Sequence, residues 1–453
     1  MNLPEAFVEK YTKLLGPEAP AFLASFDLPA HSGYRVNPLR PDAASAANPD
    51  DARINYSPNG YVGKVDGNSI AHVSGYVYSQ EPSAQLVGAV AAAQPGMRVL
   101  DLCAAPGGKS TYLAGSMANQ GVLVSNEINL GRARILASNI ERWGARNVIV
   151  TNNDPASLAK VFPAFFDLIL VDAPCSGEGM FRKDPDAVQY WDSDYPARCA
   201  ERQREIVAEA VKMLAPGGSL VYSTCTFAPE EDEQMVAWML ANTALQVSPI
   251  TKLPGMSSAR PEWANGDPSI AGAVRLWPQT QLGEGHFVAR LQLPGASEQL
   301  RPATTKKHAK KGKTREPLSK VQRELWTDWC NTNLTQTPAG DLVLMGEQLY
   351  AQPAGMPKMT GARVLRPGLH LGTFKKNRFE PSHSLATALP ESAFKFSLDV
   401  DDEQFRKYRH GETLSTTIAG KGTVLLTNTG KGFAIGRLVN GTVKNLYPKG
   451  LRI

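Results

Sequence analysis

Two cysteines stand in loops whose composition could support covalent chemistry. Cys175 ends the segment Asp172–Cys175, which reads Asp-Ala-Pro-Cys, and Cys225 lies in the segment Ser223–Thr226, which reads Ser-Thr-Cys-Thr. An apolar run typical of a buried strand precedes each of them. Open α/β sheets bind ligands at the carboxyl ends of their strands. The pattern therefore predicts two thiols at one ligand-binding edge, where a thiolate can act as nucleophile.

A glycine-rich turn, Asp101–Ser110, stands at a third strand end and reads Asp-Leu-Cys-Ala-Ala-Pro-Gly-Gly-Lys-Ser. A phosphate-binding loop would need glycine where Cys103 stands, and the Gly-x-Gly-x-x-Gly dinucleotide pattern is absent as well. The adjacent glycines, Gly107 and Gly108, admit a ligand close to the backbone, and the amides of the following helix start favour a carboxylate. The turn therefore predicts a site for a cofactor that carries a carboxylate and no phosphate.

Two acids follow at the ends of the next two strands. Glu127 stands where a carboxylate usually accepts both ribose hydroxyls, and Asp154 stands where one could meet an adenine amino group. Either acid alone could be an ordinary solvent-facing side chain. Together with the glycine turn, on three consecutive strands, they favour S-adenosylmethionine as the cofactor.

The elements that must position these residues alternate between strand and helix from residue 73 to residue 293. Helical stretches separate the first five strands, which is typical of a doubly wound, mostly parallel sheet of the Rossmann-like α/β class. The strands are expected at residues 98–102, 122–125, 148–151, 166–171, 219–222 and 287–291.

Three further segments flank this domain. Residues 1–72 are expected to form a small α/β module that begins with an amphipathic helix. Residues 294–318 are a basic linker, and residues 319–453 begin with a Trp-containing helix and end in glycine-punctuated hairpins. Residues 1–300 hold 23 Lys and Arg against 31 Asp and Glu, whereas residues 301–453 hold 25 against 12. This asymmetry favours a polyanionic partner held by the carboxyl-terminal part, although charge runs are often only a solvated surface.

Composition excludes several classes of protein. The five cysteines include no Cys-x-x-Cys pair and the seven histidines show no His-Glu-x-x-His spacing, so neither a disulfide framework nor a metal site is expected. There is no signal-peptide pattern and no run of roughly 18 apolar residues, the length that a membrane helix needs. We expect a cytoplasmic protein without a membrane partner.

The segments Asp101–Ser110, Asp172–Gly179 and Ser223–Thr226 resemble the motifs of the Nol/Nop/Sun family of RNA cytosine-5 methyltransferases. Within that family the chain is most similar to the bacterial small-subunit ribosomal RNA enzymes of the F type. The resemblance implies RNA-binding modules at both ends, the last of them PUA-like toward the carboxyl terminus. It also implies 16S ribosomal RNA or the 30S subunit as partner, no DNA partner and a monomeric enzyme; transfer RNA is the alternative substrate.

The resemblance also implies the roles of individual residues. Cys225 would be the nucleophile, Cys175 would assist product release, and the cofactor shell would comprise Cys103, Ala104, Ala105, Pro106, Gly107, Gly108, Lys109, Glu127, Asp154 and Asp172. Two departures from the family pattern concern acids. Many members have Asp where Glu127 stands, and the family often has Glu-Glu-Asn where this chain has Glu230-Glu231-Asp232.

The chemistry explains why these residue types are needed. A thiolate that adds to C6 of cytosine makes C5 nucleophilic toward a methyl donor, and Asp172 would hold a proton at N3. A second thiol would then help to eliminate the first. Lys183 could support the thiolate, hold a phosphate or simply face solvent. The residues alone leave open which cysteine attacks, because DNA cytosine methyltransferases use a Pro-Cys thiol like that of Cys175.

Two rival functions are weaker. A catalytically retired ribosome-assembly factor would have no reason to keep both thiols, Asp172 and the glycine turn. A DNA methyltransferase would need a large target-recognition insertion, for which the interval between Cys175 and Cys225 leaves no room.

Overall fold

A computed structural model describes residues 1–295 and 318–453, so almost all of the predicted basic linker lies outside the described residues. The catalytic region is built on a ten-stranded mixed sheet in the order β10-β11-β12-β8-β7-β4-β5-β6-β15, with β9 paired to β12. Five of these strands run parallel in the centre: β4 (Arg98–Asp101), β5 (Val122–Asn126), β6 (Val148–Thr151), β7 (Phe166–Asp172) and β8 (Leu214–Thr224). The predicted Rossmann-like domain is confirmed.

The strand order reverses between β4 and β7, which are hydrogen-bonded neighbours although two strands separate them in the sequence. Ligands bind at such a switch point, outside the carboxyl ends of the strands. The parallel register aligns Asp101 with Leu170 and Asp172 with Ser223. The glycine turn and both cysteine loops consequently leave the sheet at the same edge, as predicted.

Antiparallel strands extend the sheet beyond β8. They are β9 (Gln246–Val247), β10 (Met256–Ser258), β11 (Val274–Leu276) and β12 (His286–Gln292). Only the last of these was predicted, because the other three have two or three residues each and show too little alternation to be recognised.

Helices cover both faces of the sheet. One core contains side chains of α4 (Pro82–Ala91), α5 (Gly108–Ser116) and α6 (Leu130–Trp143). The core on the other face contains side chains of α7 (Pro155–Val161), α8 (Tyr195–Met213) and α9 (Glu233–Asn242). This double coverage explains why the central strands are apolar throughout rather than alternating.

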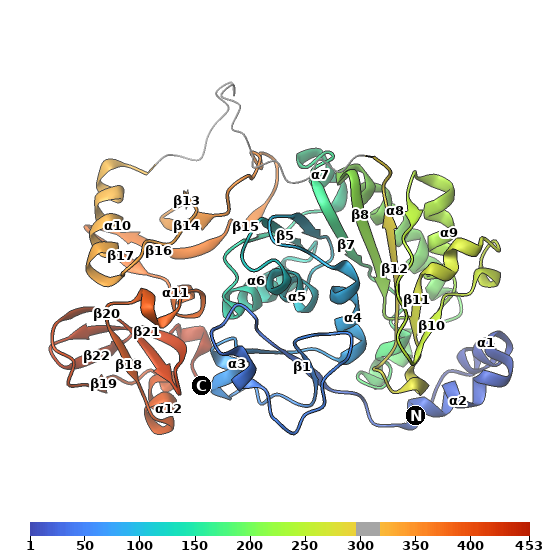
Figure 1. Ribbon diagram of the computed structural model, residues 1–453, viewed down its shortest axis with the longest axis horizontal. Coiled ribbons are helices and arrows are strands. Elements are labelled where there is room, and N and C mark those ends of the chain that lie inside the picture. The colour runs from blue at the N-terminus through green and yellow to red at the C-terminus, as the bar shows by residue number, and fades with distance from the viewer. Residues whose placement is uncertain (296–317) are drawn as a thin grey trace.

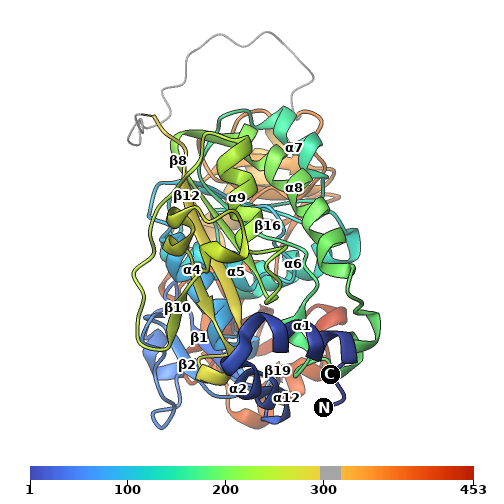
Figure 2. The ribbon, with the colours of Figure 1, turned by 90° about the vertical axis from the view of Figure 1, so that its right-hand side faces the viewer.

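The amino-terminal module has two parts. Its antiparallel sheet combines β1 (Gly33–Val36), β2 (Gly60–Val62) and β3 (Val77–Ser79), with α3 (Ile70–Val73) before the last strand. Since β3 pairs with β1, the module extends beyond the expected boundary at residue 72. The helices α1 (Glu5–Leu15) and α2 (Ala19–Ala24) lie apart from this sheet, at the right-hand end of the molecule in Figure 1 and nearest the viewer in Figure 2.

The carboxyl-terminal region contains two smaller sheets. One has the order β13-β14-β16-β17 and the other β18-β20-β21-β22-β19. The strands are β13 (Asp341–Met345), β14 (Gln348–Gln352), β16 (Leu369–Lys375), β17 (Arg378–Pro381), β18 (Ser397–Asp399), β19 (Leu414–Ser415), β20 (Lys421–Asn428), β21 (Lys431–Val439) and β22 (Thr442–Asn445). The helices are α10 (Lys320–Asn333), α11 (Ser384–Ala388) and α12 (Asp402–His410).

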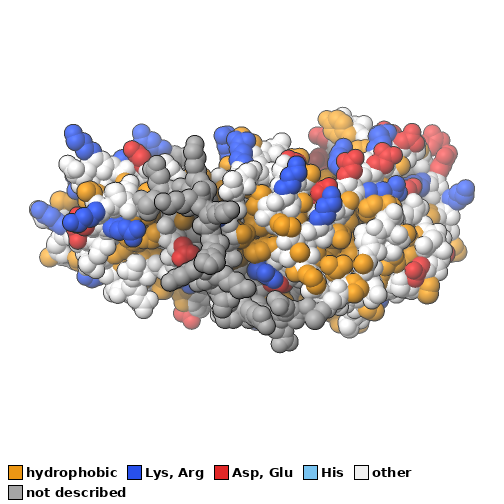
Figure 3. Space-filling view, turned by 90° about the horizontal axis from the view of Figure 1, so that it is seen from above, with side chains coloured by type: hydrophobic (Ala, Val, Ile, Leu, Met, Phe, Trp, Pro, Cys, Tyr) orange, Lys and Arg blue, Asp and Glu red, His pale blue; other side chains and the backbone are white. Residues whose placement is uncertain are grey.

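One strand of this region crosses into the catalytic sheet. β15 (Val364–Arg366) pairs with β6 in antiparallel fashion, and the Arg363 carbonyl accepts a hydrogen bond of 2.9 Å from the amide of Asn152. No pattern in the sequence predicted this pairing. Figure 3 shows blue Lys and Arg side chains along the carboxyl-terminal side, whereas red Asp and Glu side chains gather at the opposite end. None of the described helices is long and apolar enough to cross a membrane.

Candidate active site

The two thiols predicted to meet are in contact. Cys175 follows β7, Cys225 follows β8, and their Sγ atoms lie 3.4 Å apart. A disulfide bond would need about 2.05 Å, so both are free thiols. The contact arises because the parallel register ends the two strands at the same level, with Asp172 beside Ser223.

An ion pair lies beside the thiols. The ammonium of Lys109, at the start of α5, is 2.6 Å from Oδ2 of Asp172, and the Ser223 hydroxyl donates to Oδ1 over 2.7 Å. Burial raises the pKa of Asp172, but the Lys109 cation, His286 and the hydrogen bonds from Lys109 and Ser223 together outweigh burial and hold that pKa below its usual value. Asp172 therefore stays a carboxylate and acts as a hydrogen-bond acceptor.

Two groups beside Cys225, the Lys109 ammonium and the Cys175 thiol, have shifted pKa values. Burial lowers the pKa of Lys109, whereas Asp172 and a Cys225 thiolate raise it, and the net result is an increase. Its hydrogen bond to Cys225 and its burial raise the pKa of Cys175 well above the usual value. Cys175 is therefore held as a thiol beside Cys225.

A buried acid at the end of β4, Asp101, supports the glycine turn. Asp101 is fully buried, accepts a hydrogen bond of 2.7 Å from the Ser110 hydroxyl, and has its pKa raised by burial to about 7. Gly107 has φ 117° and caps α5; a Cβ there would be strained by this φ and would lie 3.2 Å from Leu136. The amide of Ala104 donates to the Asn126 carbonyl over 2.8 Å, which ties the turn to β5.

A cavity of about 860 Å³ opens between the turn and the cysteine loops. Glu127 lines it and is 3% exposed; its Oε1 accepts from the amide of Asn129 over 2.8 Å, and its Oε2 lies 3.6 Å from Arg132. Asp154 lines the cavity too, but its carboxylate caps α7 by accepting from the amide and hydroxyl of Ser157, over 2.8 and 2.7 Å. Both acids line the cavity, and Asp154 also caps the amino end of α7.

The residues present fit S-adenosylmethionine. The cavity has the size typical of small-molecule sites, and an acid for a ribose stands at one strand end beside the apolar side chains of Ile128 and Ile206. The cavity also reaches Cys175 and Cys225, so a methyl donor bound there would lie next to both thiols. Its walls comprise Leu102, Cys103, Ala105, Asn126, Glu127, Ile128, Arg132, Asp154, Pro155, Ala156, Asp172, Ala173, Pro174, Cys175, Gly177, Arg202, Glu205, Ile206, Ala208, Glu209 and Cys225.

Lys183 is not brought to the cysteines. Its side chain is exposed and does not line the cavity. Its charge acts instead on Glu81 and His31, since it lowers the pKa of each. The structure therefore places Lys183 on the surface beside the site, where it could meet a phosphate of a bound nucleic acid.

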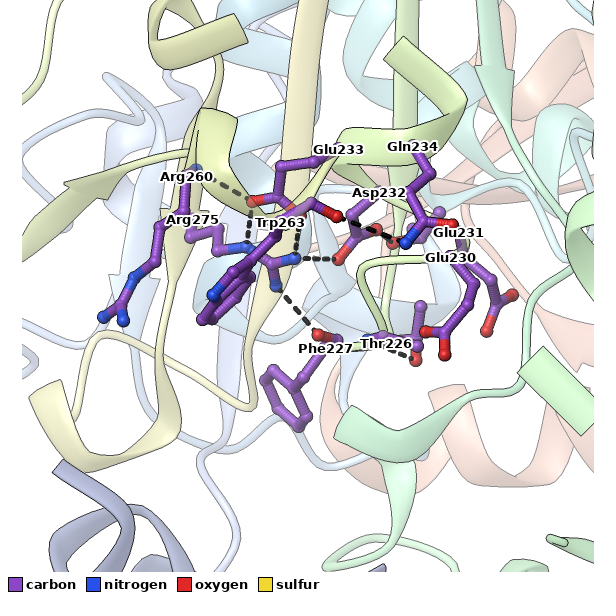
Figure 4. A network of polar contacts seen from close by, with 12 residues as sticks. Thr226, Phe227, Glu230, Glu231, Asp232, Glu233, Gln234, Arg260, Trp263 and Arg275 are labelled. Carbon is purple, nitrogen blue, oxygen red and sulfur yellow. Dashed lines mark hydrogen bonds and ion pairs between the residues drawn. The ribbon is translucent and has the colours of Figure 1, made fainter. Parts of the chain in front are cut away.

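Buried charged groups hold the Cys225 loop, and two of them, Glu233 and Arg275, were not singled out in the sequence. The Thr224 hydroxyl donates to Asp232 over 2.6 Å, and Arg275 donates to the Phe227 carbonyl over 3.2 Å. Figure 4 shows the guanidinium of Arg275 between Asp232, at 2.9 Å, and Glu233, at 2.5 Å. The departure from Glu-Glu-Asn thus places a carboxyl group, Asp232, against a buried arginine.

Comparisons with known proteins cover most of the chain. Four family models match: the N-terminal domain of 16S rRNA methyltransferase RsmF at residues 3–82, 16S rRNA methyltransferase RsmB/F at 89–292, the RsmF first C-terminal domain at 328–389 and the methyltransferase RsmF PUA domain at 395–453. The ribosomal RNA small subunit methyltransferase F of Cronobacter sakazakii is 32% identical over 99% of this chain and 96% of its own length. The chain belongs to the ribosomal RNA small subunit methyltransferase F family.

Other relatives extend the finding. The methyltransferase F of Vibrio parahaemolyticus is 32% identical over 99% of this chain and 97% of its own. A methyltransferase homologue from Pyrococcus horikoshii superposes with a TM-score of 0.56 at 27% identity, over 64% of this chain and 95% of its own. NSun6 from the same organism, solved with SFG, has a TM-score of 0.56 at 21% identity, over 64% and 98%, and shows the fold alone. The methyltransferase F family enzymes use S-adenosylmethionine, and the PUA domain confirms the predicted module at the carboxyl end.

Proposed function

We propose that this methyltransferase F family enzyme forms 5-methylcytosine in 16S ribosomal RNA, with Cys225 as the covalent nucleophile. The observation that carries the proposal is the cluster at the cavity mouth. There Cys225 faces the cation of Lys109, Asp172 is ionised, and Cys175 lies 3.4 Å away as a thiol. Asp172 and Cys175 thus have the protonation states that their steps require.

The reaction begins when the Cys225 thiolate forms a bond with C6 of a cytosine extruded from the RNA. The ring electrons move toward N3, which takes up a proton from solvent, and the Asp172 carboxylate stabilises that proton by accepting a hydrogen bond. C5 is now nucleophilic. When bound, S-adenosylmethionine supplies the methyl group that C5 attacks.

Product release reverses the first bond. The proton on C5 and the proton taken up at N3 pass to solvent, the C5–C6 double bond re-forms, and Cys225 departs as a thiolate. Cys175 touches the departing sulfur and supports this step. Residues Cys103 to Lys109, with Glu127, Asp154 and Asp172, would hold the cofactor, and Lys183 would contact the RNA backbone.

The modules at the two ends would place the RNA, and the basic carboxyl-terminal part would supply electrostatic affinity. We propose a monomer that works in the cytoplasm on ribosomal RNA or the 30S subunit, without a DNA or membrane partner.

The test is transfer of tritium from labelled S-adenosylmethionine to 16S ribosomal RNA, transfer RNA and DNA side by side. We expect label in ribosomal RNA at position 5 of cytosine. The variant Cys225→Ala should lose transfer and keep wild-type cofactor affinity. Turnover by this variant, or label in transfer RNA alone, would contradict the proposal.

A further inference from the structure

A chain of hydrogen bonds runs behind the two catalytic cysteines and joins two buried carboxyl groups. Ser176, next to Cys175, contacts Glu231, and the Ser176 and Thr226 hydroxyls lie 2.8 Å apart. Thr226, next to Cys225, lies 2.8 Å from Oε2 of Glu178. Both carboxyl groups are fully buried. The chain thus links the loop of each thiol to the loop of the other.

The series of hydrogen bonds requires one hydrogen more than its two hydroxyl groups supply. It has three oxygen–oxygen contacts, and each needs one hydrogen, but the hydroxyls of Ser176 and Thr226 supply only two. The third must sit on one of the two acids. The Thr226 hydroxyl then makes all the hydrogen bonds that it can, since it also accepts from the amide of Ala228 over 3.3 Å.

The other hydrogen bonds decide which acid carries it. Glu178 accepts from the Tyr11 hydroxyl, from Trp191 Nε1 over 2.9 Å and from the Phe227 amide over 3.0 Å, so donors meet both of its oxygens. This arrangement stabilises the ionised form. Besides the Ser176 hydroxyl, the donors to the Glu231 side chain among the described residues are the amide of Ser176 and Gln203, over 3.0 and 2.8 Å.

We propose that Glu231, as a neutral acid, and Glu178, as a carboxylate, are positioning residues that hold the Cys175 and Cys225 loops together through Ser176 and Thr226. The inference rests on the proposed role of Cys225 as nucleophile. The neutral state proposed for Glu231 agrees with its burial, which raises its pKa to about 8. The titratable groups that face Glu231 would also disfavour a charge there or are neutral themselves: Cys175, Glu178, Cys199, Tyr222 and Asp232.

The amino-terminal helices take part in this arrangement. The Tyr11 hydroxyl of α1 reaches Glu178, and the rings of Phe7 and Phe22 pack with Phe181 and Phe227 on the two linked loops. The amide of Gly179 donates to the Cys225 carbonyl over 2.8 Å, which fixes the nucleophile itself. A helix pair distant in sequence from the cysteines therefore supports their geometry.

Substitution by glutamine should affect the two acids differently, because one is proposed to be neutral and the other ionised. In Glu231→Gln the new NH₂ donates to Ser176 as the acid proton did, and the amide oxygen still accepts from Ser176 and Gln203. In Glu178→Gln the NH₂ must face either the N–H of Trp191 or that of Phe227, and neither donor can turn away. Glu230→Gln is the matched control, because Glu230 is adjacent but partly exposed and pairs with Lys10 at 3.0 Å.

The assay is single-turnover trapping of the full-length enzyme on 16S RNA that contains 5-fluorocytidine, which has no C5 proton to lose, with S-adenosylmethionine present. Near pH 6.5, Glu231→Gln and Glu230→Gln should form the Cys225 adduct at the wild-type rate, whereas Glu178→Gln should be slower by about tenfold to a hundredfold. Above pH 8, Glu231→Gln should overtake the wild type, because it cannot lose its hydrogen. Cofactor affinity should be unchanged in all variants.

The outcomes are distinguishable. If the wild type forms no adduct, or Cys225→Ala still forms one, the proposed function fails. If the wild type is trapped but Glu231→Gln is as slow as Glu178→Gln, or its rate follows the wild-type pH profile throughout, the shared-proton inference is wrong. Should Glu178→Gln not fold, the comparison of Glu231→Gln with the wild type across pH decides alone.

Discussion

The neutral state of Glu231 should be visible in the stability of the protein. Its pKa is raised by burial from 4.5 to about 8, so between these values the folded state holds a proton that the unfolded state has lost. Stability therefore falls as pH rises through this window, by about 1.4 kcal/mol for each pH unit that lies within it. Between pH 6 and pH 8 the wild type should lose about 2–3 kcal/mol relative to Glu231→Gln, which cannot titrate there.

Urea unfolding at pH 6, 7, 8 and 9, followed by circular dichroism, measures this difference. Other buried groups titrate in the same range, among them Asp101, whose pKa is about 7, but they are common to both proteins and cancel. The difference should level off about one pH unit above 8, where Glu231 is mostly ionised in both states. A difference that is flat from pH 6 to pH 9 would mean that Glu231 is already ionised at pH 6 and would refute the reasoning.

Three further outcomes are expected. Cys175→Ala should methylate RNA but accumulate a denaturation-resistant adduct that requires Cys225; gel electrophoresis of the double variant without either thiol should show none. Glu127→Ala should weaken cofactor binding by about 1.5–3 kcal/mol in calorimetry, since it removes a bond to a charged group, whereas Asp154→Asn keeps the cap of α7 and should have a smaller effect. A chain ending near residue 294 should bind RNA with a flatter salt dependence, and it should melt at a lower temperature because β6 loses β15; an unchanged slope would leave the basic region without a role in RNA binding.

Much of the site could be predicted because its residues lie in three continuous segments at strand ends. The apolar runs identify the strands, and parallel pairing then brings their carboxyl ends together, so Cys175, Cys225 and the glycine turn had to meet. The charges at the thiols were out of reach, since they depend on side-chain directions. Lys109 was expected only as part of the cofactor shell, yet it also faces Asp172 and Cys225.

The supporting residues were missed for a different reason. Glu178 and Glu231 lie inside or beside the same motifs, but an acid in a loop usually faces water, and only burial shows that these two do not. Polar residues flanking both cysteines were the available signal. Arg275 gave no signal, because it stands on a three-residue strand, β11, that is too short to show an alternating pattern.

The pairing of β15 with β6 has a consequence for synthesis of the chain. Until residue 366 has left the ribosome, β6 is an unprotected edge strand whose backbone groups could pair with another nascent chain. The other parallel strands, up to β8, are complete by residue 224. About 140 further residues must be synthesised before β15 covers the edge, which takes roughly 7 to 28 seconds at 5 to 20 residues per second. A chaperone that shields that edge in the interval would be most needed by this protein while it is still being translated.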